Sequence, residues 1–350
     1  MAVYKIFPTK DATLYSAYPN MNTGTDAILE VSNTNPDISP SPRVARSLLD
    51  FYQLEIDDVL DNKVDGANHR CNLKLYIAEA TGITTDTMIE AYPISSSWKV
   101  GTGQYLDSPQ STNGTSWNYR NYSGSDAWDN AGGDYINTLT PPQHFYLRSS
   151  KDININVTDI VNEWRANSYN NYGFMLKLDS SQEFISGSAN QPQFKYFSVD
   201  TNTIYPPCLE ISWNDFSYET GSLSPLTTSD VKMALDSNPG IFYSESINRF
   251  RLNVRPEFPV RTFQTASLYT TNHYLPTASY YAIKDLDTDE FVVDFDSSYT
   301  KISCDGNGNY FDIYMNGLEP ERYYKILVQT TISGSTIVKD ENYTFKVVNG

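Results

Sequence analysis

The chain has 350 residues, a formal net charge of −17 and an aromatic fraction of 14 %, which is dominated by 27 tyrosines. Charged residues make up only 19 % of the chain, so the composition excludes a disordered protein and predicts folded domains that bury their own cores. An acidic surface repels phosphate groups, so binding to nucleic acid or to an anionic membrane is disfavoured.

The N-terminal segment 1–15 alternates like a β-strand. No charged segment with an apolar stretch precedes it, and no run approaches 18 apolar residues, so we expect neither a signal peptide nor a transmembrane segment. Cys71, Cys208 and Cys304 are far apart and odd in number, which suggests neither a disulfide framework nor a zinc site. We expect three reduced, at least partly buried thiols and synthesis in a reducing cytoplasm.

Short β-rich runs between Asn, Gly, Pro, Ser and Asp clusters predict strands along most of the chain. The clearest runs are 47–51, 72–78, 172–178, 208–213, 250–254 and 311–315. In the last run, Phe311, Ile313 and Met315 alternate with other residues and are expected to face one core. Regularly spaced short strands predict an all-β fold of sandwich modules.

Helical signals are scarce. One short helix is predicted to begin at Thr158, where Ile160, Val161 and Trp164 share one face. A second is predicted near Ser229, with its apolar positions at 231 and 235.

Changes in composition divide the chain into two modules. Residues 1–213 form a first, jelly-roll-like sandwich with a Pro- and Ser-rich insertion at 33–43 and an aromatic-rich insertion at 95–143. Residues 214–228 are rich in Ser, Thr and Gly and predict a linker. Residues 229–350 are expected to form the second sandwich.

The first module resembles the DNRLRE-type β-sandwich, a carbohydrate-binding-like module of surface proteins and phage structural proteins. The resemblance covers about residues 4–213, and the long Tyr-rich loop after Trp98 departs from the family pattern. The fragments that carry the resemblance are, in chain order, Asp11–Tyr15, Arg46–Phe51, Trp98 with Gly114–Trp117, Val157–Trp164, Tyr172–Leu176, Phe197–Asp200 and Pro207–Ile211.

The second module contains Leu318-Glu-Pro-Glu-Arg-Tyr-Tyr324-Lys-Ile326-Leu-Val328. This segment resembles the L-x-P-x-x-x-Y-x-I-x-V pattern of fibronectin type III and related Ig-like sandwiches. In those folds the tyrosine fixes a corner between strands through a hydrogen bond to the backbone. The resemblance implies the same role for Tyr324.

Both modules together, on an acidic chain with no predicted export signal, resemble the virion proteins of T4-type tailed phages. The resemblance implies a protein that is made in the host cytoplasm and carried in the particle as a neck, tail or capsid accessory component. The expected partners are other virion proteins in a symmetric, multi-copy assembly.

Motifs for catalysis are missing from the sequence. The three histidines, His69, His144 and His273, fit no metal-ligand spacing, and no G-x-S-x-G, P-loop or dinucleotide-binding glycine pattern is present. Carboxylates near the aromatic insertion are interpreted as turn residues, although composition alone leaves a glycosidase pair open. Residues 305–312 are interpreted as a hairpin turn rather than a calcium loop. We therefore expect no catalytic residues, no metal and no cofactor.

The aromatic insertion is the strongest candidate for a binding site. Its rings could stack on sugars, could form a protein interface or could pack the insertion onto its own sandwich. The leading hypothesis is a non-enzymatic structural protein that acts through protein contacts, and the alternative is a module that recognises a surface glycan. The candidate residues are Trp98, Trp117, Tyr119, Tyr122, Trp128 and Tyr135.

Overall fold

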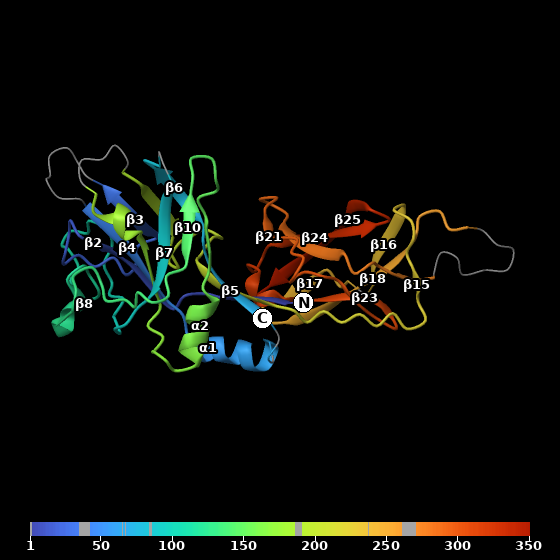
Figure 1. The fold of residues 1–350 in the computed structure, drawn as a ribbon, viewed down its shortest axis with the longest axis horizontal. Helices are drawn as coiled ribbons and strands as arrows, with labels where there is room; N and C mark the ends of the chain where they lie inside the picture. The colour runs from blue at the N-terminus through green and yellow to red at the C-terminus, as the bar shows by residue number, and fades with distance from the viewer. Residues whose placement is uncertain are drawn as a thin grey trace. The chain divides into compact units, whose positions relative to one another are not determined.

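The computed structural model describes residues 2–34, 43–64, 66, 68–83, 86–185, 191–236, 238–260 and 271–350. Strands dominate these residues and helices are few and short, which confirms the expected all-β fold of sandwich modules (Figure 1). The insertion predicted at 33–43 lies almost entirely outside the described residues.

Contacts divide the chain into two compact units. The first sandwich unit comprises Ile6–Lys63 and Arg70–Glu210, and the second comprises Met1–Lys5, Val64–His69 and Ile211–Gly350. The expected linker, 214–228, belongs to the second unit and is held there: the Ser217 carbonyl accepts the Cys304 N–H at 3.0 Å, and the Tyr218 hydroxyl donates to the Leu275 carbonyl at 2.6 Å.

The first unit contains most of the early elements of the chain. An eight-stranded sheet has the order β10-β7-β12-β4-β3-β13-β6, with β2 paired to β4. A further sheet has the order β1-β14-β5-β11; of its residues, Ala2–Lys5, His69 and Ile211–Trp213 are assigned to the second unit. The strands are β1 (Ala2–Ile6), β2 (Lys10–Tyr15), β3 (Ile28–Thr34), β4 (Arg43–Asp50), β5 (His69–Leu75), β6 (Ile77–Thr81), β7 (Thr87–Pro93), β8 (Tyr119–Asn121), β9 (Asp126–Ala127), β10 (Pro142–Phe145), β11 (Ile153–Asn156), β12 (Phe174–Leu178), β13 (Gln193–Phe197) and β14 (Cys208–Trp213).

The second unit is built from a four-stranded sheet, β16-β18-β23-β22, and a five-stranded sheet, β17-β25-β24-β20-β21. Its core includes Phe311, Ile313 and Met315, so their predicted common orientation is confirmed. The strands are β15 (Ser224–Pro225), β16 (Val231–Asp236), β17 (Ile241–Tyr243), β18 (Ile247–Pro256), β19 (His273–Tyr274), β20 (Ser279–Asp285), β21 (Phe291–Val293), β22 (Ser303–Asp305), β23 (Gly308–Tyr314), β24 (Tyr323–Ile332) and β25 (Ser335–Val348).

The helix predicted at Thr158 is confirmed as α2 (Thr158–Arg165), whose buried face carries Ile160, Val161 and Trp164. The sequence patterns did not predict the remaining short helical elements, which are α1 (Gln53–Asp58), the π-helical turn η1 (Val59–Val64), α3 (Ser180–Glu183) and the 3₁₀ turns η2 (Tyr122–Gly124) and η3 (Met315–Gly317).

The helix predicted near Ser229 is wrong, because this segment is strand β16. Val231 and Met233 are buried while Lys232 and Ala234 are exposed, which is the alternation of a half-buried strand. Positions 231 and 235 fit both a helical and an alternating period, and pairing of the whole segment with β18 decides in favour of the strand.

All three cysteines are free and buried, as expected. Burial raises the pKa of the Cys71 thiol to about 12 and that of Cys304 to about 11, so both are protonated near neutral pH. Among the residues that the structure describes, no helix has both the length and the apolar character needed to cross a bilayer.

Candidate functional site

The three tryptophans of the aromatic insertion are core residues of the first unit. Trp98, Trp117 and Trp128 are only 2 %, 8 % and 5 % exposed. Two indole N–H groups donate to backbone carbonyls, Trp98 to Tyr172 at 3.0 Å and Trp128 to Ser116 at 2.9 Å. These rings therefore do not form the exposed stacking platform that glycan binding through them requires.

The insertion covers one face of the eight-stranded sheet. The buried tryptophans share a cluster with Leu14, Leu48 and Met175, which come from β2, β4 and β12. Every residue of β12 is buried, and so are the six central residues of β4. A strand that is buried on both sides needs cover on both faces of its sheet. The insertion supplies that cover, so it is a structural layer of the fold.

Asn22 fixes this layer to the sandwich. Its side-chain amide donates to the carbonyls of Val100 and Thr115 at 2.6 and 2.8 Å, and its oxygen accepts the Gly103 N–H at 2.8 Å. Asn22 itself is fully buried. A Cβ on Gly103 would lie only 2.4 Å from the Asn22 carbonyl oxygen, so glycine is required where the insertion approaches this residue.

The three candidate tyrosines lie nearer the surface, and each is partly buried. The rings of Tyr119 and Tyr122 contact each other edge to face at 4.7 Å between centroids, and Tyr135 makes a similar contact with Tyr92, also at 4.7 Å. The structure thus separates the six predicted residues into three buried indoles, one tyrosine packed against the sheet and one partly buried tyrosine pair.

A buried group of three charged residues lies under the insertion. Arg46 binds both carboxylate oxygens of Glu183 at 2.6 and 2.9 Å, and Lys177 binds the same carboxylate at 3.2 Å. The three side chains are at most 6 % exposed. The guanidinium carbon of Arg46 lies 5.0 Å from the centroid of the Trp117 ring. Lys177 interrupts an otherwise apolar run in the sequence, and this charged residue in a predicted buried strand is the signal that could have indicated the group.

This charged group is arranged for structure rather than for catalysis. Both oxygens of Glu183 are already bound by cations, so the carboxylate is not available as a base or a nucleophile. The third Arg46 contact, from Nη1 to the Gly132 carbonyl at 2.8 Å, attaches the insertion to the same group. The cluster therefore joins the sheet, α3 and the insertion.

Two carboxylates of the insertion hold turns. Asp134 accepts the backbone N–H groups of Asp129 and Asn130 at 2.9 and 2.8 Å, and Asp107 accepts the Gln104 N–H at 2.8 Å. Among the described residues, no group of three or more His, Cys, Asp or Glu side chains is placed to hold a metal ion.

Asp305 lies at the end of a hairpin, as interpreted from the sequence. It pairs with Gly308 across the turn between β22 and β23. Both of its carboxylate oxygens are bound by Arg251, at 2.9 and 2.7 Å, and these hydrogen bonds hold its pKa at about 2. The carboxylate is therefore committed to an ion pair.

A row of exposed apolar side chains lies on the outer face of the five-stranded sheet in the second unit. Its members are Ile241, Tyr243, Phe291 and Tyr323, which are between 45 % and 62 % exposed. The inward neighbours of two of them, Phe242 and Tyr324, pack into the core, so these strands present their next residues to the outside. We call these four residues the outer sheet patch.

Lysines lie between the apolar members of the outer sheet patch. Lys346 stands between Ile241 and Tyr323 across three neighbouring strands, and its ammonium lies 5.8 Å from the centroid of the Tyr323 ring. Lys284 is paired with Phe291 and lies 4.8 Å from the centroid of its ring. Glu321 and Asp289 bind these two lysines, so their charges are locally balanced.

Comparisons with known proteins identify no family for this chain. No family model matches the chain, and no curated protein matches it. One solved structure that aligns with it is a crystal structure described as a beta-galactosidase from Bacteroides fragilis, with 10 % identity and a TM-score of 0.19. The alignment covers 97 % of this chain and 41 % of that protein, and a likeness this low supports no statement about fold or activity.

Proposed function

We propose that this protein is a non-enzymatic structural component of a tailed-phage virion, a neck, tail or capsid accessory protein that acts through contacts with other virion proteins. The observation that carries the contact part of the proposal is the outer sheet patch. Two tyrosines, a phenylalanine and an isoleucine are exposed on one sheet face, and such residues dominate the energy of protein interfaces.

The electrostatics of the patch support the same proposal. The chain as a whole carries a net charge of −17, so two acidic surfaces repel each other on approach. At the patch, Lys284 pairs with Asp289 and Lys346 pairs with Glu321, so these charges cancel locally. The two lysines lie beside the rings of Phe291 and Tyr323. The virion part of the proposal rests on the two sequence resemblances and on the acidic, tyrosine-rich composition.

Replacement of patch residues tests the contact part. Tyr243→Ser and Tyr323→Ser remove exposed rings without opening the core, and Tyr52→Ser, at a 54 % exposed tyrosine of the first unit, is the matched control. Loss of a hot-spot ring costs about 2 kcal/mol or more, so incorporation of the double variant into particles should fall by at least roughly tenfold. Normal incorporation of the double variant would exclude the patch as the contact surface.

A further inference from the structure

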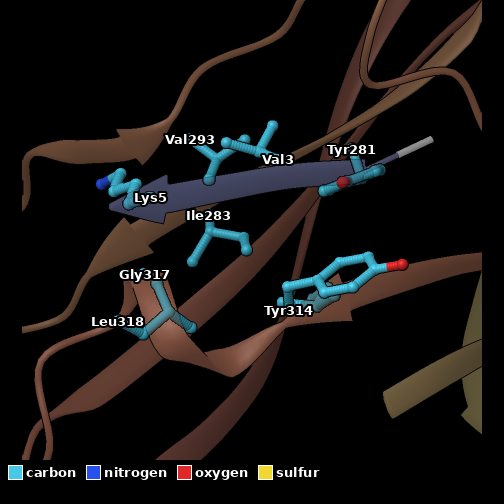
Figure 2. A pocket seen from close by; sticks show the side chains of 9 residues that line it. Val3, Lys5, Tyr281, Ile283, Val293, Tyr314, Gly317 and Leu318 are labelled. Carbon is cyan, nitrogen blue, oxygen red and sulfur yellow. The ribbon is translucent and has the colours of Figure 1, made fainter. Parts of the chain in front are cut away.

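A groove in the second unit has no room for a ligand. Figure 2 shows Val3 and Lys5 of β1 beside Ile283, Tyr314 and Leu318, which line the groove with them. The space left for water is about 10 Å³, roughly one water molecule, so β1 fills the groove.

A pocket in the first unit, by contrast, is open. Residues 138–141, which lead into β10, form one of its walls, and the junction of β11 and α2 forms the other. Its volume is about 210 Å³. That is space for roughly seven water molecules at about 30 Å³ each, so the pocket can take a small organic molecule.

Both walls of this pocket are fixed to the sandwich by backbone hydrogen bonds. On one side the Pro141 carbonyl accepts the N–H of Ala91, in β7, at 3.1 Å. On the other side the Val157 N–H donates to the carbonyl of Cys71, in β5, at 2.8 Å. The pocket is therefore formed before any ligand arrives, which is usual for small-molecule sites.

The pocket lies along a gap between two edge strands. β10 and β11 are each the last strand of their sheet. The Gln143 side chain bridges one part of this gap: its oxygen accepts the Asn154 N–H at 2.7 Å, and its nitrogen donates to the Asp152 carbonyl at 2.8 Å. The pocket opens further along, beside Thr140 and Asn156.

The lining combines an apolar floor with polar groups. Val157 and Ile160, which form the floor, are only 1 % and 0 % exposed. Around them stand the hydroxyls of Thr138 and Thr140 and the carboxylate of Asp159. No Lys, Arg or His is among the described residues that line the pocket, so an anionic ligand would meet Asp159 without a cation to offset the repulsion.

Asn156 adds a donor with a fixed orientation. Its Oδ1 accepts both the N–H and the hydroxyl of Thr158, at 3.1 and 2.6 Å. These two bonds decide which side of the amide carries the oxygen, and the NH₂ group is then the side that donates to a ligand. The pocket thus offers a donor in Asn156 and an acceptor in Asp159. A hydroxyl can use both, whereas an ammonium group can only donate.

We infer that this pocket binds a single pyranose sugar residue. A pyranose ring carries hydroxyls around its edge, which suit Asn156 and Asp159, and C–H groups on its faces, which suit the floor of Val157 and Ile160. The site uses none of the six candidate aromatic residues. The inference does not rest on the proposed function, because the outer sheet patch belongs to the other unit.

Ligand-observed NMR on the full chain tests the inference. The probes are the methyl pyranosides of glucose, galactose, mannose and N-acetylglucosamine, and the charged comparators are methylammonium and inorganic phosphate. At least one pyranoside should bind with a Kd on the order of 1 mM, as expected for so small a ligand, and neither charged comparator should displace it.

Asp159→Ala should raise the Kd of that pyranoside at least roughly tenfold, because it removes a charged acceptor. Asp129→Ala, at another exposed carboxylate of the same unit, is the matched control and should leave the Kd unchanged. Thermal unfolding checks that both variants are folded.

Three results would overturn the inference. The first is that none of the four pyranosides binds to the parent chain. The second is that the Asp159→Ala and Asp129→Ala proteins bind the pyranoside with the same Kd. The third is that methylammonium displaces the pyranoside, which would assign the pocket to cations.

Discussion

The hydroxyl of Tyr324 donates a hydrogen bond to the carbonyl oxygen of Glu319, five residues earlier, at 2.8 Å. This bond closes the corner that leads into β24, and the ring itself is buried in the core of the second unit. It is the tyrosine-corner contact implied by the Ig-like sequence pattern.

Tyr324→Phe should lower the free energy of unfolding of the second unit by about 1 kcal/mol, since it removes one hydrogen bond and keeps the ring. Urea unfolding followed by fluorescence measures the change. Tyr323→Phe, at the exposed neighbouring position, is the control and should have little effect. Equal effects of the two substitutions would show that the corner bond does not stabilise the unit.

Glu183→Gln should destabilise the first unit strongly, because Arg46 and Lys177 would then be buried opposite a neutral amide. Breaking a buried pair by removing one partner costs about 3–5 kcal/mol. The matched control is Glu79→Gln, which breaks a surface pair with Lys195 at 2.7 Å and should cost less than about 1 kcal/mol. Thermal unfolding of both variants compares them, and a Glu183→Gln protein as stable as the control would contradict this account of the cluster.

Trp117→Ala should behave as a core substitution. The ring is 8 % exposed and packs with the sheet, so its loss should cost about 3–5 kcal/mol of stability. Tyr122→Ala, at the partly buried tyrosine pair, should cost much less. If the Trp117→Ala protein kept its stability but lost binding on a glycan array, the ring would be a ligand platform and the structural interpretation would fail.

Asp11 should make stability depend on pH. It is 1 % exposed, and burial raises its pKa to about 7, although the carboxylate accepts the Val199 N–H at 2.7 Å. The nearby carboxylates of Asp200 and Asp26 act in the same direction. Because the folded state holds this proton more tightly than the unfolded state, Asp11 favours folding below about pH 4. That contribution is lost as the pH rises towards 7.

Asp11→Asn should therefore flatten the decline in stability between about pH 4 and 7 and should raise stability above pH 7, by up to roughly 4 kcal/mol. Chemical unfolding at several pH values measures this slope. Asp129→Asn, at an exposed carboxylate, serves as the control and should leave the slope unchanged. If the free energy of unfolding of the Asp11→Asn protein fell with pH as steeply as that of the parent protein, another group would be responsible for the pH dependence.

The sequence predicted a strand or a helix correctly where the spacing of its apolar residues fits only one of the two. Alternation placed Phe311, Ile313 and Met315 in one core, and the apolar spacing at Ile160 and Trp164 defined α2. The segment at Val231 was misassigned because its apolar spacing fits both a helix and a strand.

Contacts between residues far apart in the sequence could not be predicted from these local patterns. Composition marked Trp98, Trp117 and Trp128 as important, but an exposed aromatic platform and a buried covering layer use the same residue types. Only the packing against Leu14 and Leu48 distinguishes them. In the same way, no local signal in segment 2–6 indicates that Lys5 contacts Asn316, more than 300 residues later.

The most direct test of the central proposal is quantitative mass spectrometry of virus particles, purified on density gradients from the source of this sequence. The proposal predicts peptides from both units at a fixed copy number relative to the major capsid protein. Absence of the chain from every purified particle would contradict it.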